Sequence, residues 1–462
     1  MIITLKKYFS PLLLLSLILI FAAATRFWRL SFPPEYYFDE VYHVVTAKLI
    51  AQNDPRAYEW WHPAPEPDTA IDWLHPPLAK LTQAISMNIF GMQSFGWRLS
   101  SAIFGVGVIA LVYAVARKLH LSETVSLLAA FLASLDGLLL TMSRITMNDI
   151  HVTFFMLLTI WLYLHWKQQP TLRNALCTGI AAGAAVASKW SGVFIVLPIF
   201  FDQLIWLIGQ KIQQKRFALS PTFTLLGSLL LCIPLIYLLS YGQMFLQGHD
   251  WSHFKELHRQ IWWYQTNLDA THPYQSTPLQ WMLNLRPVYT YTNNVGVNHI
   301  QNMYIQGNPL LFWTGVIAVL WTISTFIIWK LNWLQLLLEA SRISNKKTLT
   351  QWQTKLRRLQ ETNQDISLLA FLLVAYASPW ILWSFSPRIM FFYHYSPAIP
   401  LLVILTSYWL EKLWQFSSWG KYLTALIVVA IALTFILFFP NWTGLVVNKS
   451  WSSLYFALSS WQ

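Results

Sequence analysis

Long apolar stretches separated by short polar ones cover most of this chain. A helix needs about 20 mostly apolar residues to cross a bilayer, and about eleven stretches approach that length. In order, these predicted spans are 10–29, 99–117, 122–141, 149–166, 173–189, 191–209, 220–240, 309–329, 366–385, 389–410 and 421–440. Because two of them almost touch, residues 188–192 are predicted to form a tight turn. The pattern therefore predicts an all-α polytopic membrane protein with about 11 transmembrane helices.

Basic residues indicate which way the helices run. Lys and Arg collect in alternate connections between the predicted spans, and cytoplasmic loops are the ones that carry this excess. These residues are Lys6, Lys7, Arg117, Lys118, Lys167, Arg173, Lys211, Lys215, Arg216, Lys346 to Arg358, Lys412 and Lys421. We therefore expect the loops 30–98 and 241–308 and the tail 441–462 to face away from the cytoplasm.

The two long outer loops are the natural place for a functional site, because long ordered loops usually carry function. Within the first, residues 76–90 place leucine and isoleucine at helical spacing, which predicts a helix lying on the membrane surface. The segment 331–365, on the opposite side, reads as a basic helix that contacts anionic lipid. We treat 1–440 as one transmembrane catalytic domain.

Composition agrees with the membrane assignment. The chain is 56% hydrophobic and only 11% charged, whereas soluble proteins are about 25% charged. The net charge of +12 is spread over loops, so it indicates orientation and not nucleic-acid binding. Cys177 and Cys232 lie within apolar runs, which predicts neither a disulfide nor a metal site. The first apolar stretch could be a signal peptide, but its length favours a retained helix.

The segment FPPEYYFDEVYH (32–43) follows the first span and holds two adjacent acids, Asp39 and Glu40. A solvated acidic loop would explain an arbitrary pair of this kind. The surrounding motifs change that interpretation.

Seven stretches in order resemble the protein O-mannosyltransferase family. They are FDEVYH (38–43), HPPL (75–78) with Lys80, Arg98 within GWRLSSAIFG, SRITMNDIHVTFF (143–155), GIAAGAAVASKWSG (179–192), THPYQSTPLQWMLNLRPVYTY (271–291) with QGNPLLFW (306–313), and SPRIMFFYHYSPAIP (386–400). The resemblance covers nearly the whole chain. It implies the GT-C membrane glycosyltransferase fold, with a helical first outer loop and an active site on the extracytoplasmic face. Residues 241–308 are too few for the β-trefoil domain of eukaryotic members, which points to a prokaryotic-type enzyme of the bacterial inner membrane.

The resemblance implies an inverting transfer of mannose from a polyprenyl-phosphate carrier to Ser or Thr hydroxyls of translocated proteins. A phosphodiester leaves without a general acid, so one carboxylate base is enough. We expect Asp39 to be that base and Glu40 to orient it or the acceptor. Cations should stabilise the leaving phosphate. We expect no cofactor and no metal.

Other polar residues in these motifs are candidates for binding the donor and its phosphate: Arg98, Arg388, Lys189, His75, Arg144, Asp149, Tyr393 and His394. For several of them an ordinary role is an open alternative. Arg98 and Lys189 could snorkel to the interface, Arg144 and Asp149 could form a structural ion pair, and His394 could be packed in a helix. Arg388 suits a diester because a guanidinium binds phosphate in a fork.

For the acceptor, the second outer loop offers His272, Tyr274 and Arg286. Its charges balance, which favours a polypeptide over the phosphorylated lipid A. A GT-C transferase that modifies lipid A or another glycan is nevertheless the nearest alternative. A secondary transporter is a third interpretation, but transporters place their charges near the bilayer midplane, whereas these candidates map to one face.

Overall fold

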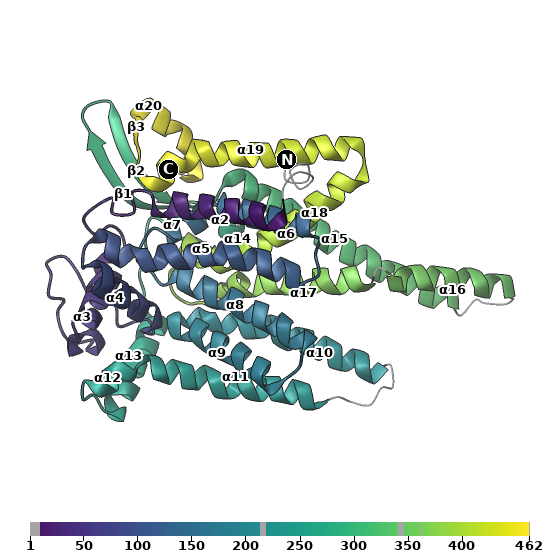
Figure 1. Cartoon of the computed structure of the whole chain (residues 1–462), viewed down its shortest axis with the longest axis horizontal. Coiled ribbons are helices and arrows are strands. Elements are labelled where there is room, and N and C mark those ends of the chain that lie inside the picture. The colour runs from purple at the N-terminus through teal and green to yellow at the C-terminus, as the bar shows by residue number, and fades with distance from the viewer. Residues whose placement is uncertain (1–9, 213–218, 341–345, 362, 462) are drawn as a thin grey trace.

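The computed structural model describes residues 10–212, 219–340, 346–361 and 363–461. Most of the helices lie side by side along one direction, and shorter elements gather at one end of the bundle (Figure 1). The α-helices are α2 (Pro11–Phe27), α3 (Glu40–Ala51), α4 (Leu78–Phe90), α5 (Ser94–Lys118), α6 (Glu123–Ser134), α7 (Gly137–Met142), α8 (Asp149–Gln168), α9 (Leu172–Ser188), α10 (Val196–Ile212), α11 (Leu219–Ser240), α12 (Gly242–Leu246), α13 (Trp251–Asn267), α14 (Pro278–Met282), α15 (Pro309–Ala340), α16 (Lys346–Glu361), α17 (Asn363–Ile381), α18 (Ile399–Phe416), α19 (Ser418–Thr443) and α20 (Lys449–Ser452). Short 3-10 helices are η1 (Pro55–Tyr58), η2 (Trp190–Ile195), η3 (Leu382–Phe385), η4 (Phe392–Ala398), η5 (Ser453–Phe456) and η6 (Ser459–Trp461).

Every predicted span coincides with helical structure. Within the described residues, six helical segments are long and apolar enough to cross a membrane: Ser94–Lys118, Trp190–Ile208, Ser220–Ser240, Pro309–Ala340, Asp365–Phe385 and Ser418–Thr443. The remaining predicted spans correspond to shorter or more buried helices such as α2 and α6. The chain is therefore a multi-pass membrane protein, and the number of crossings stays a prediction.

Two breaks between consecutive helices contain a charged residue. The predicted span 122–141 breaks between α6 and α7, where the Asp136 carboxylate caps α7 by accepting a hydrogen bond of 2.8 Å from the Leu139 N–H. The tight turn predicted at 188–192 is a single extended residue, Lys189 (φ −161°, ψ 138°), followed by η2. Each break places a charged side chain inside the bundle.

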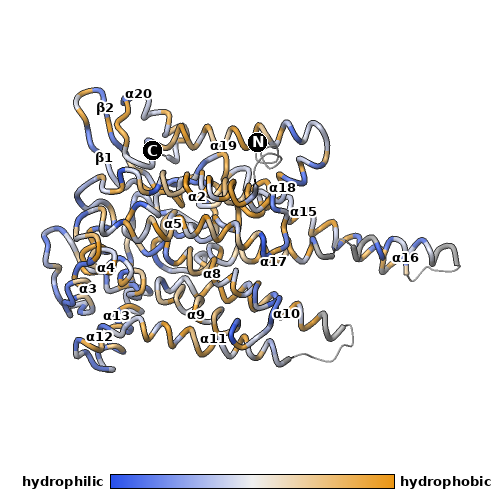
Figure 2. Tube along the Cα trace, viewed as in Figure 1, coloured by the Kyte–Doolittle hydropathy of each residue, from blue (hydrophilic) through white to orange (hydrophobic). Residues whose placement is uncertain are grey.

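Apolar residues concentrate on the central helices and polar residues at the end that carries α3, α12 and the strands (Figure 2). The connections rich in Lys and Arg meet one another at the opposite end. There the Lys118 Nζ lies 2.9 Å from His165 Nδ1 on α8, and Ser122 donates to Glu411 on α18. Among the basic residues of the sequence prediction, Lys6, Lys7, Lys215 and Arg216 lie outside the described residues. The two predicted outer loops thus form one end of the molecule.

Helix α4 confirms the helix predicted in the first outer loop and presents its apolar side outward. Ile85 and Ile89 are exposed by 59% and 67%, as expected for a helix whose apolar side faces lipid. Its polar side packs inward, where Gln83 donates to the Met147 carbonyl at 3.1 Å and Ser86 donates to the Gly96 carbonyl at 2.6 Å. The inward side of α4 supplies Lys80 to the site described below.

The second outer loop contains a feature that the helical assignment missed, a three-stranded antiparallel sheet. Its strands are β1 (Val288–Val295), β2 (His299–Ile305) and β3 (Val446–Asn448), in the order β1-β2-β3. Strand β3 belongs to the C-terminal tail, and the Trp461 indole donates to the Asn284 carbonyl at 2.7 Å. The tail therefore packs onto the second outer loop.

Close packing of α9 against α11 fixes the position of Lys189. Gly179 and Gly183 are spaced as in small-residue helix interfaces, and a Cβ on Gly179 would lie 2.6 Å from the Ser228 carbonyl oxygen. Without side chains at these two positions the helix backbones approach each other directly. This contact with α11 fixes the position of the C-terminal end of α9 and of the extended Lys189 that follows it.

Candidate active site

Asp39 and Glu40 lie where the first outer loop turns into α3. Phe38 has a left-handed backbone (φ 54°), and Asp39 is the N-cap residue of α3. The Asp39 carboxylate makes no capping hydrogen bond, so it remains available for other contacts. Asp39 is partly exposed, whereas its neighbour Glu40 is completely buried. The two adjacent acids therefore have different surroundings.

Glu40 forms a buried ion pair with Arg98 of α5. The Arg98 Nε donates to Glu40 Oε1 at 2.8 Å and its Nη2 donates to Oε2 at 2.7 Å. The Thr146 N–H also donates to Oε1, at 3.1 Å. A forked geometry of this kind is the stronger class of charge-assisted hydrogen bond. Glu40 thus ties α3 to α5 and to the loop before α8.

The remaining Arg98 N–H groups are occupied as well. Nη1 donates to the carbonyls of Leu30 and Pro33, and Nη2 donates to that of Glu35. A guanidinium has five N–H donors, and all five have acceptors here. No donor is left for the phosphate that the sequence prediction assigned to this arginine. The geometry favours a structural role for Arg98 in holding the segment that carries Asp39.

Arg144 also makes backbone contacts. Its Nη1 donates to the carbonyls of Thr25, Arg26 and Trp28 at 3.1, 3.0 and 2.7 Å, at the C-terminal end of α2. A cation at that position is favourable because it meets the negative end of the helix dipole. The ion pair considered between Arg144 and Asp149 is absent from the contacts of these described residues. The alternative of a structural ion pair therefore named the wrong cation for Asp149.

Asp149, the first residue of α8, pairs instead with Lys189. The Lys189 Nζ donates to Asp149 Oδ1 at 2.7 Å, and the same ammonium lies 5.5 Å from the centre of the Tyr393 ring. Tyr393 in turn interacts with the Asp39 carboxylate. The structure thus brings four predicted residues, Asp39, Asp149, Lys189 and Tyr393, into one cluster where α3, α8, α9 and η4 meet.

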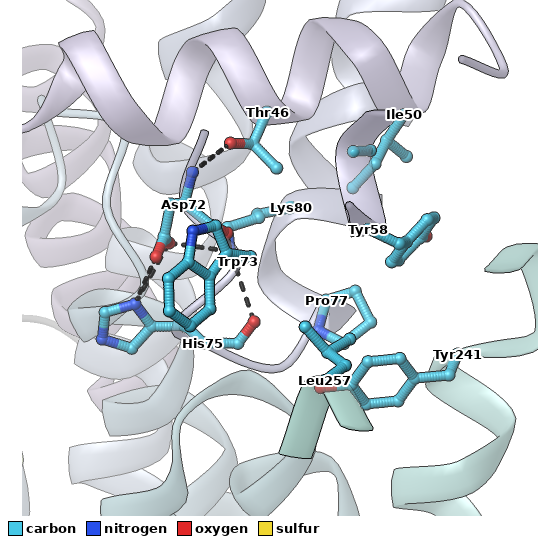
Figure 3. Close-up of a pocket in the computed structure, with 11 residues that line it drawn as sticks. Thr46, Ile50, Tyr58, Asp72, Trp73, His75, Pro77, Lys80, Tyr241 and Leu257 are labelled. Carbon is cyan, nitrogen blue, oxygen red and sulfur yellow. Dashed lines mark hydrogen bonds and ion pairs between the residues drawn. The ribbon is translucent and has the colours of Figure 1, made fainter. Parts of the chain in front are cut away.

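A second carboxylate, Asp72, organises the side of the cluster formed by the first outer loop (Figure 3). Its side chain is almost fully buried and contacts His43 at 2.9 Å, His75 at 2.9 Å and Lys80 at 2.7 Å. The Asp72 N–H donates to Thr46 Oγ1 at 2.7 Å. A small cavity of about 10 Å³ lies beside these residues, which is room for about one water molecule. Asp72 therefore holds His43 and His75 together, with their rings 5.6 Å apart.

The electrostatic setting differs sharply between the two loop carboxylates. Burial alone would raise the pKa of Asp72, but the three basic side chains around it hold that pKa well below its usual range. For Asp39, burial is the main cause that raises the pKa to about 6, and two neighbouring carboxylates act in the same direction. Burial lowers the pKa of His75 to about 4. At neutral pH the site therefore contains an ionised Asp39 of unusually high basicity.

A groove of about 520 Å³ opens beside this cluster. It is lined by residues 270–273, 275–277 and 280 of the second outer loop, by Arg286, and by residues 387–390. Predicted donor residue Arg388 and predicted acceptor residues His272 and Arg286 therefore share one groove. Tyr274 lies at its side, with its ring 5.8 Å from His272. Arg388 donates to Gln265 of α13, and its buried Nε makes no hydrogen bond.

The groove connects to the Asp39 cluster through a stack of rings. His272 meets Phe391 at 5.2 Å, and Phe391 stacks on Tyr393 at 5.5 Å. The predicted His394 is part of this packing, since its ring lies 4.3 Å from that of Trp383 and its Nδ1 lies 2.9 Å from the Phe391 carbonyl oxygen. This geometry favours the packed-histidine alternative for His394.

Sequence reasoning missed the roles of Asp72 and His43. Both stand inside or beside the quoted motifs, His43 one helical turn after Asp39 and Asp72 three residues before His75. Helical spacing alone places His43 near Asp39. The contact of Asp72 with His75 is local, but nothing local indicates that His43 and Lys80 join them, because these two residues lie on α3 and α4.

Two protein-family profiles match the chain and between them cover residues 73–461. One is described as "Dolichyl-phosphate-mannose-protein mannosyltransferase" and matches residues 73–257. The other is described as "C-terminal four TMM region of protein-O-mannosyltransferase" and matches residues 250–461.

Similar proteins carry corresponding names. The polyprenol-phosphate-mannose–protein mannosyltransferase of Corynebacterium glutamicum is 26% identical, over 67% of this chain and 72% of that protein. The protein of the same name from Mycolicibacterium smegmatis is 23% identical over 96% of this chain and 91% of its own length. Among solved structures, the S. cerevisiae protein O-mannosyltransferase Pmt1–Pmt2 complex bound to the sugar donor superimposes with a TM-score of 0.74 and 15% identity, covering 98% of this chain and 93% of that one. The fold is the GT-C fold that the family resemblance implies.

Proposed function

Because this chain belongs to the protein O-mannosyltransferase family, we propose that it transfers mannose from a polyprenyl-phosphate carrier to Ser or Thr hydroxyls of polypeptides. The observation that carries the proposal is the Asp39 carboxylate, which is partly exposed, free of capping bonds and flanked by the Lys189–Asp149 pair. A protein hydroxyl and a lipid-linked sugar both reach a site at the membrane surface. We place their meeting point at Asp39, at the N-terminus of α3.

In the proposed reaction, the acceptor oxygen attacks the anomeric carbon of mannose from the face opposite the phosphate. The new carbon–oxygen bond forms as the bond to the phosphate oxygen breaks, and Asp39 takes the hydroxyl proton. The leaving polyprenyl phosphate carries the electron pair away. Tyr393, which interacts with the Asp39 carboxylate, limits the positions open to it, and orientation of this kind is a main source of rate enhancement.

Stabilisation of the leaving phosphate is assigned to Lys189 and Arg388. Lys189 lies in the cluster with Asp39 and Tyr393, and Arg388 lines the groove next to it. A cation aimed at developing negative charge acts strongly where water is excluded. Glu40 and Arg98 are assigned to positioning Asp39, because all five Arg98 N–H groups already have acceptors, whereas an ammonium has three donors and Lys189 needs only one for Asp149.

The experiment that tests the function offers the purified protein a polyprenyl-phosphate-mannose donor together with a threonine-containing peptide or with lipid A. We expect mannose on the peptide threonine, with inversion at the anomeric carbon, and none on lipid A. Mannose found only on lipid A would refute the protein-acceptor assignment while leaving the role of Asp39 intact. If the protein binds the donor but transfers mannose to neither acceptor, both the protein-acceptor assignment and the role of Asp39 would be refuted.

The pH dependence of transfer follows from the raised pKa of Asp39. The base must be ionised, and its pKa is about 6, so kcat/KM should be constant above about pH 7 and fall about tenfold per unit below pH 6. The measurement is kcat/KM for the peptide between pH 5 and 8 at saturating donor. Residual activity of an Asp39→Asn variant should lack this acidic limb. A flat profile in the wild-type enzyme would contradict the assignment.

A membrane orientation belongs to the proposal. We propose a bacterial inner-membrane location with the loops 30–98 and 241–308 on the periplasmic side, since the basic connections meet at the other end of the bundle. In a variant lacking Cys177 and Cys232, single cysteines at Gln52 and Asn267 should react with an impermeant thiol reagent from outside, and one at Ser418 should not. If only Ser418→Cys were labelled from outside, the orientation would be the opposite of the proposed one and the site would not face the periplasm.

Arg388 provides a separate test of donor binding. A charge-assisted hydrogen bond to phosphate contributes about 1.5–3 kcal/mol, so Arg388→Ala should weaken donor binding by roughly 10- to 100-fold. Arg388→Lys should recover only part of the loss because the fork is absent. Arg259→Ala is the matched control, since Arg259 is an exposed arginine on α13 that pairs with Glu256. An unchanged donor Kd in Arg388→Ala would exclude a phosphate contact.

A further inference from the structure

Among the strands of the described residues, none covers one edge of β1. Strand β2 lies between β1 and β3, so β1 is a terminal strand, and none of the described residues bonds to its outer edge through backbone hydrogen bonds. The first half of the strand is buried or partly buried, whereas residues Thr292–Val295 are exposed. An edge of this kind presents unpaired backbone N–H and C=O groups to the solvent.

This edge lacks the features that normally keep an exposed edge strand from pairing with other chains. Natural edge strands carry charged residues, proline or bulges that prevent pairing with other chains. Between Val288 and Ile305 there is no Lys, Arg, Asp, Glu or Pro. The one irregularity of the β1–β2 ladder lies at its base, between Tyr289 and Tyr291. From Tyr291 to Val295 the register is continuous, so the exposed part is a regular pairing template.

The hairpin is also held rigidly. Thr292 donates to the Asn302 side chain at 2.7 Å, and Asn293 donates to that of Gln301 at 3.2 Å. Strand β2 is in turn anchored to the rest of the chain, because Gln301 donates to the Gly444 carbonyl at 3.1 Å. A template that is already ordered loses little entropy when a partner pairs with it.

The base of the edge touches the segment that carries Asp39. The Tyr291 ring lies 5.8 Å from Phe32 and 6.4 Å from Tyr37, and Tyr37 is two residues before Asp39. On the other side, Tyr289 stacks on Tyr274 at 6.0 Å, next to the groove. A chain paired along Thr292–Val295 that continues past Tyr291 therefore runs toward the segment that carries Asp39.

We propose that the edge of β1 over Thr292–Val295 binds the acceptor polypeptide as an added antiparallel or parallel strand, which delivers a neighbouring Ser or Thr to Asp39. The inference rests on the proposed function. Pairing of this type uses backbone hydrogen bonds for affinity and therefore places little demand on the acceptor sequence. The side chains of this part of the strand, Thr292, Asn293 and Asn294, are uncharged, which agrees with binding that depends little on the acceptor sequence.

The test compares two acceptors and two enzyme variants. One acceptor is a capped tripeptide with a central threonine, too short to pair with the edge, and the other is an extended peptide of roughly twelve residues containing one threonine. The variants are Asn293→Pro and Asn294→Pro. Successive N–H groups of a strand point to opposite sides, so one proline removes an outward N–H and the other removes an N–H that faces β2.

With wild-type enzyme we expect a higher kcat/KM for the long peptide than for the tripeptide. The variant whose proline removes the outward N–H should have a kcat/KM for the long peptide about tenfold lower than wild type. Its kcat/KM for the tripeptide should be unchanged. Unchanged activity on both peptides in both variants would overturn the edge proposal and leave the proposed function standing. An equal loss of activity on the long peptide and the tripeptide would have the same meaning. A changed oligomeric mass in detergent, with the peptide preference retained, would assign the edge to a second copy. Failure of wild-type enzyme on both peptides would instead count against the protein acceptor itself.

Discussion

Replacing Asp39 by asparagine is expected to lower kcat by about 10²–10⁴-fold, the usual contribution of a general base. Donor affinity should stay within about twofold, because the carboxylate acts on the acceptor proton in the transition state and not on the bound lipid. The measurements are single-turnover transfer to a threonine peptide and equilibrium binding of the donor lipid. Asparagine keeps the size of the side chain, so the turn at Phe38 and the start of α3 should be preserved.

Asp68→Asn is the matched control for this experiment. Asp68 is an exposed acid of the same outer loop, and its replacement should leave kcat unchanged. If Asp39→Asn keeps more than about a tenth of the wild-type kcat, a loss below about 1.4 kcal/mol, then Asp39 is not the base. Glu40 would not replace it, since both of its oxygens are bonded to Arg98. Asp149 would then be the carboxylate to examine.

Replacing Arg98 by alanine is expected to destabilise the folded protein by about 3–5 kcal/mol, because Glu40 would be left as a buried charge without a partner. Glu40 and Arg98 are both fully buried, and the carbonyls of residues 30, 33 and 35 would lose their donors as well. The measurement is thermal unfolding of the purified protein in detergent, together with the yield of monodisperse material.

A double variant distinguishes this structural role from a contact with the donor phosphate. Glu40→Leu combined with Arg98→Met removes both charges and should recover much of the lost stability, as replacement of buried pairs by apolar residues often does. Arg117→Ala, an exposed arginine at the far end of α5, should cost little. An Arg98→Ala protein with wild-type stability and greatly weakened donor binding would restore the phosphate role for Arg98.

Several properties of this protein are determined locally and could be predicted from sequence. A membrane span needs a certain length of apolar residues, and that requirement acts on each segment independently. The predicted spans therefore coincide with helices, and their errors are confined to the ends and to breaks such as the one at Asp136. The motif around Asp39 also determines its own position, because a loop that follows a span must emerge at the membrane surface. The family could be recognised for the same reason, from short stretches in a consistent order.

The partners of the charged residues were decided by the tertiary structure. Arg144 and Asp149 are close in sequence and were natural candidates for an ion pair, yet Arg144 caps α2 and Asp149 binds Lys189. Arg98 was expected at the phosphate and is instead paired with Glu40. Coulomb attraction has no sequence signature, because any nearby opposite charge satisfies it once the chain has folded.

The β-hairpin and the Asp72 cluster are two further features that could not be predicted from the sequence. The stretch 288–305 alternates too weakly to identify a strand, and its pairing with β3 joins segments more than a hundred residues apart. Asp72 has an ordinary local sequence and becomes central because α3, α4 and the loop between them bring His43, His75 and Lys80 to one carboxylate. The sequence by itself determined which segments form apolar helices and in which loop the Asp39–Glu40 pair stands, since these follow from local hydrophobicity. Only the tertiary structure decided which charges neutralise each other, because that depends on contacts between distant segments.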